Sequence, residues 1–256
     1  MTNKEILETA LLQSSYDCNC GINDFLAEQN VVTVSKPHPK ARKYLPLPFE
    51  CDLVSYGSNV VAQTSERTRE AVSEYISKYA PAYKCFEAPY INKLNDLLAE
   101  FDLRVCFMAE YFLPDVTKLT EPDCGAELRV LHKDGFADLY TSQWGNCLTF
   151  HDKDRDVLAV GAYDNGRLVG LAGCSADCET MYQIGVDVLP EYRRKGIGSA
   201  VTSKLAIEVL KLGKVPFYCA AWSNIRSVRN AVKSGFRPAW AELTARETKF
   251  VYDLIK

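Results

Sequence analysis

One stretch constrains the fold of this chain more than any other. An apolar run at residues 184–189 is followed by Pro190, a short basic segment and a helical pattern that begins at Gly198. This order predicts a strand, a tight loop and a helix start in direct succession. The first amides of a helix have no partner within it and lie at the positive end of the helix dipole. The stretch therefore predicts a binding site for a phosphate group.

The composition of this loop indicates which phosphate ligand it binds. Gly196 and Gly198 lack a β-carbon, so the backbone can curve around a phosphate and adopt positive φ angles. No Lys-Ser or Lys-Thr pair follows Gly198, which excludes the triphosphatase loop, and the spacing is not a G-x-G-x-x-G dinucleotide fingerprint. We expect a pyrophosphate ligand. Three cationic side chains are available for it: Arg193, Arg194 and Lys195.

The spacing Arg193-x-x-Gly196-x-Gly198, after Val-Leu-Pro-Glu-Tyr, resembles the acyl-CoA loop of the GNAT superfamily of N-acyltransferases. A second motif in the family's order supports the resemblance, because a strand leads to a helix that starts near Asn224 and ends before Gly235-Phe236. The resemblance covers roughly residues 126 to 250. It implies a mixed α/β fold with a splayed central sheet. It also implies acetyl-CoA as the acyl donor and direct transfer of the acetyl group to an amine in a ternary complex.

The resemblance also implies where the donor binds. The pantetheine arm is expected to bond the backbone around Val186 and Val188, beside a strand at 216–222, and Asn224 is expected to help fix it. The N–H of Val188 is expected to hold the oxyanion. The implied donor-binding residues are Val186, Val188, Arg193, Arg194, Lys195, Gly196, Ile197, Gly198, Ser199, Asn224 and Ser227.

Acyl transfer to an amine requires a group that accepts the amine proton. Asp187, a lone carboxylate in an apolar strand, is the first candidate, and Glu179 and Tyr182 are the others. If Asp187 is the general base, changing it to Asn should lower the activity roughly 10²- to 10⁴-fold. The alternative is that Asp187 is a solvated or hydrogen-bonded strand residue.

The chain differs from the family pattern at the position of the residue that protonates the leaving thiolate. Seven residues after Asn224, where many family members have a tyrosine, this chain has Ala231. Asn230, Ser227 and Tyr218 are the candidates to replace that tyrosine, and solvent is a further one. The departure keeps a second hypothesis open, a non-catalytic acyl-CoA-binding sensor or assembly module.

Composition limits the classes of partner. Apolar residues make up 47% and charged residues 25% of 256 residues, with a net charge of −3, so we expect no nucleic-acid partner. No apolar run reaches the roughly 18 residues that span a bilayer, and we expect a cytoplasmic protein without a membrane partner. The ten cysteines include no C-x-x-C pair, and no metal site is expected. The acceptor is expected to be a small-molecule or peptide amine, and a homodimer is left open.

The chain is longer than such an acyltransferase core needs, and we expect two domains. A proline-bracketed linker at 114–123 suggests a smaller α/β domain at 1–122 and the GNAT-like domain at 123–256. The latter should contain a single helical stretch at 132–150 where family members often have two helices. We expect the N-terminal domain to cover the acceptor pocket, unless it serves targeting or dimerisation. Three tyrosines are expected to be exposed for this purpose: Tyr75, Tyr79 and Tyr90.

Overall fold

A computed structural model describes residues 1–78, 82–121 and 123–256. Internal contacts divide the chain into two compact units. Unit 1 comprises Met1–Ala10 and Phe112–Pro238, and unit 2 comprises Leu11–Tyr111 and Ala239–Lys256. The predicted boundary residue Pro122 and the predicted exposed Tyr79 lie outside the described residues. The division into domains at 1–122 and 123–256 stays a prediction.

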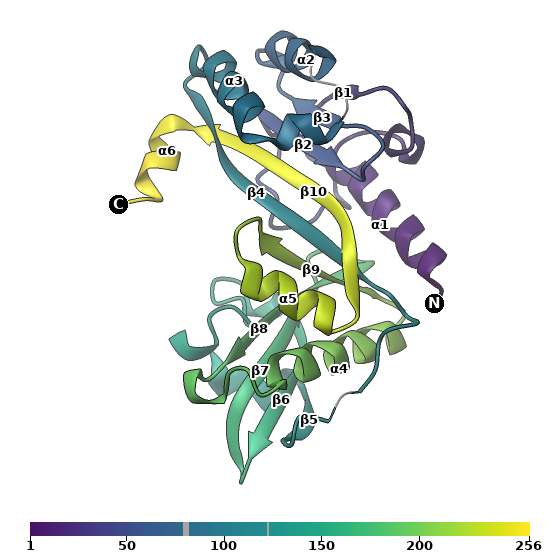
Figure 1. Ribbon diagram of the computed structural model, residues 1–256, viewed down its shortest axis with the longest axis vertical. Coiled ribbons are helices and arrows are strands. Elements are labelled where there is room, and N and C mark those ends of the chain that lie inside the picture. The colour runs from purple at the N-terminus through teal and green to yellow at the C-terminus, as the bar shows by residue number, and fades with distance from the viewer. Residues whose placement is uncertain (79–81, 122) are drawn as a thin grey trace. The chain divides into compact units, whose positions relative to one another are not determined.

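Unit 1 contains the predicted strand, loop and helix start (Figure 1). Its strands lie in the order β9-β8-β7-β6-β5, with β8 and β9 parallel and the other neighbours antiparallel. Its strands are β5 (Glu127–His132), β6 (Asp156–Asp164), β7 (Arg167–Ser175), β8 (Met181–Val188) and β9 (Val215–Ala221). Its helices are α4 (Ile197–Lys211), α5 (Ile225–Lys233) and the 3₁₀ helices η3 (Lys133–Leu139), η4 (Ser142–Trp144), η5 (Lys153–Arg155) and η6 (Pro190–Tyr192).

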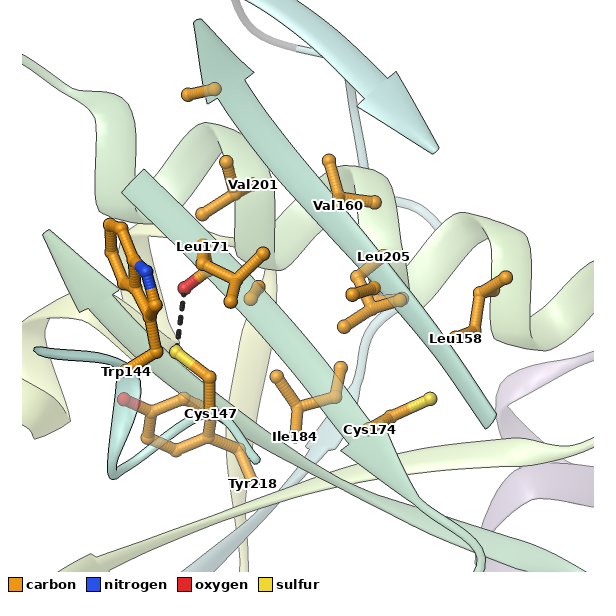
Figure 2. Close-up of a cluster of buried hydrophobic side chains, with 14 of the residues drawn as sticks. Trp144, Cys147, Leu158, Val160, Leu171, Cys174, Ile184, Val201, Leu205 and Tyr218 are labelled. Carbon is orange, nitrogen blue, oxygen red and sulfur yellow. Dashed lines mark hydrogen bonds between the residues drawn. The ribbon is translucent and has the colours of Figure 1, made fainter. Parts of the chain in front are cut away.

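The core of unit 1 lies between α4 and the strands β6, β7 and β8, against which α4 packs. Figure 2 shows part of it, with Val201 and Leu205 of α4 in one cluster with the strand residues Val160 and Leu171. The buried stripe forms because apolar residues recur on one face of the helix. This packing fixes the N-terminus of α4 at the end of β8.

The predicted helical stretch at 132–150 is not an α-helix, and that prediction was wrong. The segment forms the short 3₁₀ helices η3 and η4 and a loop. The physical reason is that two carboxylates outside the segment accept hydrogen bonds from two of the amides that a continuous helix would use internally. The N–H of Asn146 donates to Asp187 at 2.8 Å, and that of Thr149 donates to Asp156 at 2.7 Å.

Unit 2 contains most of the N-terminal half and the C-terminal residues. Its strands lie in the order β1-β3-β2-β10-β4, with β1 parallel to β3 and β2 antiparallel to both β3 and β10. Its elements are η1 (Ile22–Phe25), β1 (Val31–Val34), β2 (Cys51–Ser55), β3 (Val61–Thr64), α2 (Arg69–Lys78), η2 (Ala82–Phe86), α3 (Ala88–Ala99) and α6 (Thr248–Asp253). Three elements have residues in both units: α1 (Asn3–Asp17), β4 (Leu103–Pro114) and β10 (Phe236–Glu247).

The expectation that Tyr75 is exposed was wrong. Tyr75 is completely buried in the core of unit 2, where it lies with Val72 and Ile76 of the same helix, and its hydroxyl donates to the carbonyl of Cys85 at 2.9 Å. The apolar stripe of α2 carries the ring inward because the three residues share one helical face. Tyr90 is partly buried against the same core. Strands and helices together confirm the predicted mixed α/β class.

Candidate active site

A cleft of about 1410 Å³ opens in unit 1. Its lining comes from β8, the end of β9, the start of α4, α5, and residues 145–151, which lie between η4 and η5. The loop at residues 193–199, called the cradle loop below, lines the same cleft. The cleft therefore brings the predicted phosphate site beside the strands between which the donor was expected.

The two parallel strands β8 and β9 separate inside the cleft. Their register runs from Met181 opposite Val215 to Ile184 opposite Tyr218 and stops there within the described residues. The N–H of Leu189 donates to the carbonyl of Val169 on β7 at 3.0 Å. Because backbone groups alternate along an antiparallel ladder, the N–H groups of Val186 and Val188 point away from β7 and toward the gap.

The cradle loop has the predicted positive φ at Gly196 but not at Gly198, which lies in the first turn of α4. Gly196 precedes α4 at φ 87°, and Arg194 also adopts a positive φ of 63°. Such left-handed residues turn successive N–H groups toward one concave side, where an anion can bind. The amides at the start of α4 extend this set, since they have no partner within the helix.

The residues of this loop that were predicted to bind the donor differ in where they lie. Five line the cleft: Arg193, Arg194, Gly196, Gly198 and Ser199. The Nε of Arg193 donates to the carbonyl of Val188 at 3.1 Å, which joins the loop to the free edge of β8. The side chains of Lys195 and Ile197 lie elsewhere. Lys195 is placed over the ring of Tyr192, and Ile197 is buried in the core.

Gly198 has a packing role, since it lies in α4 without a positive φ. A β-carbon there would lie 2.9 Å from Oδ1 of Asn230 and 3.5 Å from Cγ2 of Val188. The absence of a side chain thus lets α5 and β8 come close to the first turn of α4. Asn230 in turn donates to Thr202 of α4 at 3.1 Å.

Only one of the three predicted proton acceptors lines the cleft. Asp187 does so, whereas Glu179 is exposed in the turn before β8 and Tyr182 packs against the core. Neither Glu179 nor Tyr182 is among the described residues of the cleft wall. The alternation of a strand places Asp187 on the face opposite to Tyr182 along β8.

The three residues predicted as possible proton donors to the leaving thiolate lie close together, on or beside α5. The Tyr218 hydroxyl and the Ser227 hydroxyl lie 2.8 Å apart, and both residues line the cleft with Asn230. Burial raises the pKa of Tyr218, so its hydroxyl stays protonated at neutral pH. Ala231 is completely buried and supplies no polar group. Asn224 is the N-cap residue of α5, and its side chain accepts a hydrogen bond from the N–H of Ser227 at 3.2 Å.

A basic face on α5 was not predicted from the sequence. Arg226, Arg229 and Lys233 all line the cleft. Their spacing of three and four residues places them on one side of a helix, which is the signal that could have identified them. Together with Arg193 and Arg194 they give the described lining five Arg or Lys residues. The same lining contains one carboxylate, that of Asp187. The cleft is therefore strongly cationic.

Residues 145–148, called the wall loop below, were also not predicted to belong to the site. A β-carbon on Gly185 would lie 1.8 Å from the carbonyl oxygen of Asn146, and one on Gly173 would lie 2.3 Å from that of Cys147. The wall loop therefore lies directly on the backbone of β7 and β8. Two glycines paired across adjacent strands were the available signal, since glycine in a strand often marks a close backbone approach.

No group of three or more His, Cys, Asp or Glu side chains in the described residues could hold a metal ion. None of the helices in these residues combines the length and apolar character that a bilayer crossing requires.

Several solved structures are similar to this chain. A putative GNAT acetyltransferase from Novosphingobium aromaticivorans has 20% identity and a TM-score of 0.45, covering 56% of this chain and 66% of its own. A GCN5-related N-acetyltransferase from Kribbella flavida has 16% identity and a TM-score of 0.46, covering 59% and 62%. A putative acetyltransferase from Salmonella typhimurium, solved with acetyl-CoA, has 17% identity and a TM-score of 0.35, covering 48% and 93%. The chain thus spans less than two thirds of the first two structures.

Comparison with curated proteins found no match. A family model does match residues 118–236, and its description is the Acetyltransferase (GNAT) family. The matched range contains the cradle loop, the gap between β8 and β9, and α5. Residues 118–236 are therefore a GNAT acetyltransferase domain, as the two sequence motifs predicted.

Proposed function

We propose that this protein is an acetyl-CoA-dependent N-acetyltransferase in which an amine attacks the bound thioester directly. One observation carries the proposal. The free edge of β8 ends at a cradle of backbone amides, and both lie within one cationic cleft of the GNAT domain. This combination suits a ligand that has amide groups in an extended arm and phosphates at one end.

The donor is proposed to bind along these features. The amides of its pantetheine arm pair with the backbone groups of Val186 on the edge of β8, as an added strand would, and the N–H of Val188 is left for the thioester. Its pyrophosphate accepts from the amides of the cradle loop, with Arg193 and Arg194 beside it. The cations on α5 are proposed to hold the remaining phosphate, the 3′-phosphate of CoA.

The reaction forms one N–C bond and breaks one C–S bond. The acceptor nitrogen attacks the carbonyl carbon of the thioester, and the N–H of Val188 stabilises the developing oxyanion. The amine loses a proton, and the departing thiolate gains one. We propose Tyr218 as the donor of that proton, because its protonated hydroxyl lies on the cleft wall next to Ser227.

A second candidate function is a non-catalytic acyl-CoA-binding module. It is favoured by Ala231, since this residue leaves no side-chain hydroxyl at the position of the family's usual tyrosine. The two candidates share the donor site and differ in turnover.

Two measurements test the proposal. Acetyl-CoA at a hundred times its dissociation constant should stabilise the protein by roughly 2.7 kcal/mol in thermal unfolding, whereas ATP and NAD should not. Gly198→Val should abolish this shift, because its side chain would collide with Asn230 and block the approach of the pyrophosphate. Equal binding by this variant and the parent would contradict the donor site.

The second measurement is release of free CoA thiol with an acceptor panel of spermidine, an aminoglycoside, free amino acids and a tripeptide with a free N-terminus. Turnover with any of them supports the enzyme. Binding of acetyl-CoA without turnover across a broad amine library would support the non-catalytic module.

A further inference from the structure

The wall loop is held against β8 by the side chain of Asp187. Oδ2 of Asp187 accepts from the N–H of Asn146 at 2.8 Å, and Oδ1 accepts from the side-chain amide of Asn146 at 2.7 Å. Both oxygens of the carboxylate thus bind the same loop residue. Hydrogen bonds to an ionised acceptor are among the stronger ones in proteins.

The thiol of Cys147 adds a further contact. Its Sγ lies 3.4 Å from Oδ2 of Asp187 and 3.0 Å from the carbonyl oxygen of Leu171 on β7, and Figure 2 shows the latter bond. Burial and the neighbouring Asp187 raise the pKa of Cys147 well above its usual value, so the thiol stays protonated and remains a donor. The wall loop is therefore bonded to both strands on which it lies.

These contacts limit what the carboxylate of Asp187 can do. A carboxylate has about four acceptor positions, and the two Asn146 donors take one on each oxygen, while the single thiol proton of Cys147 is shared between Asp187 and the nearer carbonyl of Leu171. An amine proton would have to displace one of these donors or share an oxygen with it. Displacement would also release the loop that lines the cleft.

The wall loop supplies part of the cleft wall, next to β8. Its position next to Asp187 places it one residue along β8 from Val188, the proposed oxyanion donor. An amine that attacks the thioester must approach near this point. The position of the loop thus controls the space left for the acceptor.

We propose that Asp187 is a positioning residue that fastens the wall loop to β8 and so shapes the acceptor side of the cleft, and that it is not the proton acceptor. This inference rests on the proposed acetyl transfer for its link to the acceptor. The fastening itself is a property of the fold and can be measured without any substrate.

Asp187→Asn tests the role of the carboxylate. The Asn amide group would face the donors of Asn146, so at least one hydrogen bond is replaced by a donor–donor contact. We expect the backbone amide of Asn146 to lose its protection from hydrogen exchange. With the panel amine that gives the highest turnover, the KM for the acceptor should rise about 10- to 100-fold, as expected for lost hydrogen bonds to a charged group. The pH at half-maximal rate should not change.

Gly185→Ala is the matched variant, because it displaces the wall loop and leaves the carboxylate intact. Its added methyl would lie 1.8 Å from the carbonyl oxygen of Asn146. We expect the same loss of amide protection and the same rise in acceptor KM. Gly135→Ala is the control, since its methyl would meet only the Leu131 side chain, at 3.7 Å and beyond. It should change neither quantity.

The outcomes separate the alternatives. If Asp187→Asn removes the pH-dependent limb of kcat while the Asn146 amide stays protected, Asp187 is the base and the inference is wrong. If Gly185→Ala exposes that amide without changing the acceptor KM, the wall loop does not shape the acceptor site. Failure of the proposed function itself would be seen separately, as absence of an acetyl-CoA thermal shift in the parent protein.

Discussion

At the scale of single residues, the hydroxyl of Tyr218 is the group on which the proposed chemistry depends most. Its side chain is only 4% exposed, and burial is the main cause of its raised pKa. Tyr218→Phe removes the proton donor and little volume. We expect kcat to fall roughly 10²-fold, the lower end of what a positioned proton donor contributes.

Two comparisons make this prediction specific to Tyr218. Acetyl-CoA affinity, measured by calorimetry, should stay within about twofold, because the phenol hydroxyl alone is lost. Tyr182→Phe is the control, since Tyr182 lies outside the cleft, and it should retain the parent kcat. A Tyr218→Phe variant with full kcat would leave solvent as the source of the proton.

Two buried carboxyl groups in unit 2 form a second residue-scale feature. Asp52 and Glu242 are 1% and 5% exposed. The oxygens of Asp52 accept from Gln63 at 2.9 Å and from Thr244 at 2.7 Å. Burial raises the pKa of Asp52 above its usual value and that of Glu242 to about 8. Both groups therefore hold protons more tightly in the folded protein than in the unfolded chain.

This pair predicts a stability that falls as pH rises. Unfolding releases protons above the ordinary carboxyl pKa near 4, so the unfolding free energy should decrease from there up to about pH 8. Urea unfolding at pH 5 and pH 8 measures the difference. Glu242→Gln should flatten the dependence, and exposed Glu28→Gln should leave it unchanged. Equal slopes for the parent and Glu242→Gln would contradict a protonated Glu242.

At the scale of elements, α5 contributes a cationic face to the cleft. If Arg226, Arg229 and Lys233 hold the 3′-phosphate, CoA should bind about 10- to 100-fold more tightly than 3′-dephospho-CoA. Changing all three to Gln should bring this ratio close to one. Calorimetry with both ligands at one ionic strength is the appropriate measurement, because phosphate contacts weaken with salt.

The comparison of CoA with 3′-dephospho-CoA separates a direct contact with the 3′-phosphate from a general attraction between the α5 cations and an anionic ligand. Loss of affinity for both ligands in equal proportion would show that α5 acts on the whole anion and not on the 3′-phosphate. Lys249→Gln, which changes an exposed cation of α6 outside the cleft, should leave the ratio of the parent intact.

At the scale of the whole molecule, the contacts predict which fragment can stand alone. A fragment of residues 123–256 loses Thr120 and Glu121, which bond Ser203 at 2.5 Å and Lys204 at 2.7 Å. It also carries the C-terminal part of β10 without its partner β2. A fragment of residues 112–238 keeps the Thr120 and Glu121 contacts and the whole of unit 1 except Met1–Ala10, and it omits that part of β10.

We expect the fragment 112–238 to stay monomeric and bind acetyl-CoA, and the fragment 123–256 to aggregate through its exposed apolar strand. Light scattering after size-exclusion chromatography distinguishes them. Equal behaviour of the two fragments would contradict this division. The same monomeric fragment tests the prediction that the N-terminal residues cover the acceptor pocket, since loss of acceptor turnover with retained donor binding would support it.

Features that depend on neighbouring residues were predictable from the sequence. The sequence Thr2-x-x-Glu5 has the pattern of a capping box. At the start of α1 the N–H of Thr2 donates to Glu5 at 2.6 Å, and the N–H of Glu5 donates to Thr2 at 3.3 Å. The turn between β6 and β7 has Asn165 and Gly166 at positive φ, as its Asn-Gly pair predicts. The positive φ at Gly196 belongs to the same class.

The sequence by itself therefore determined the strand, cradle loop and helix start, because their geometry depends on local backbone preferences and glycine positions. Tertiary structure alone decided that Asp187 bonds Asn146, 41 residues away, and that the cations of α5 line the same cleft as the cradle loop. It also replaced the predicted helix at 132–150 with 3₁₀ turns. Local periodicity carries no record of distant partners, and a carboxylate brought close by folding can take the amides on which a helix depends.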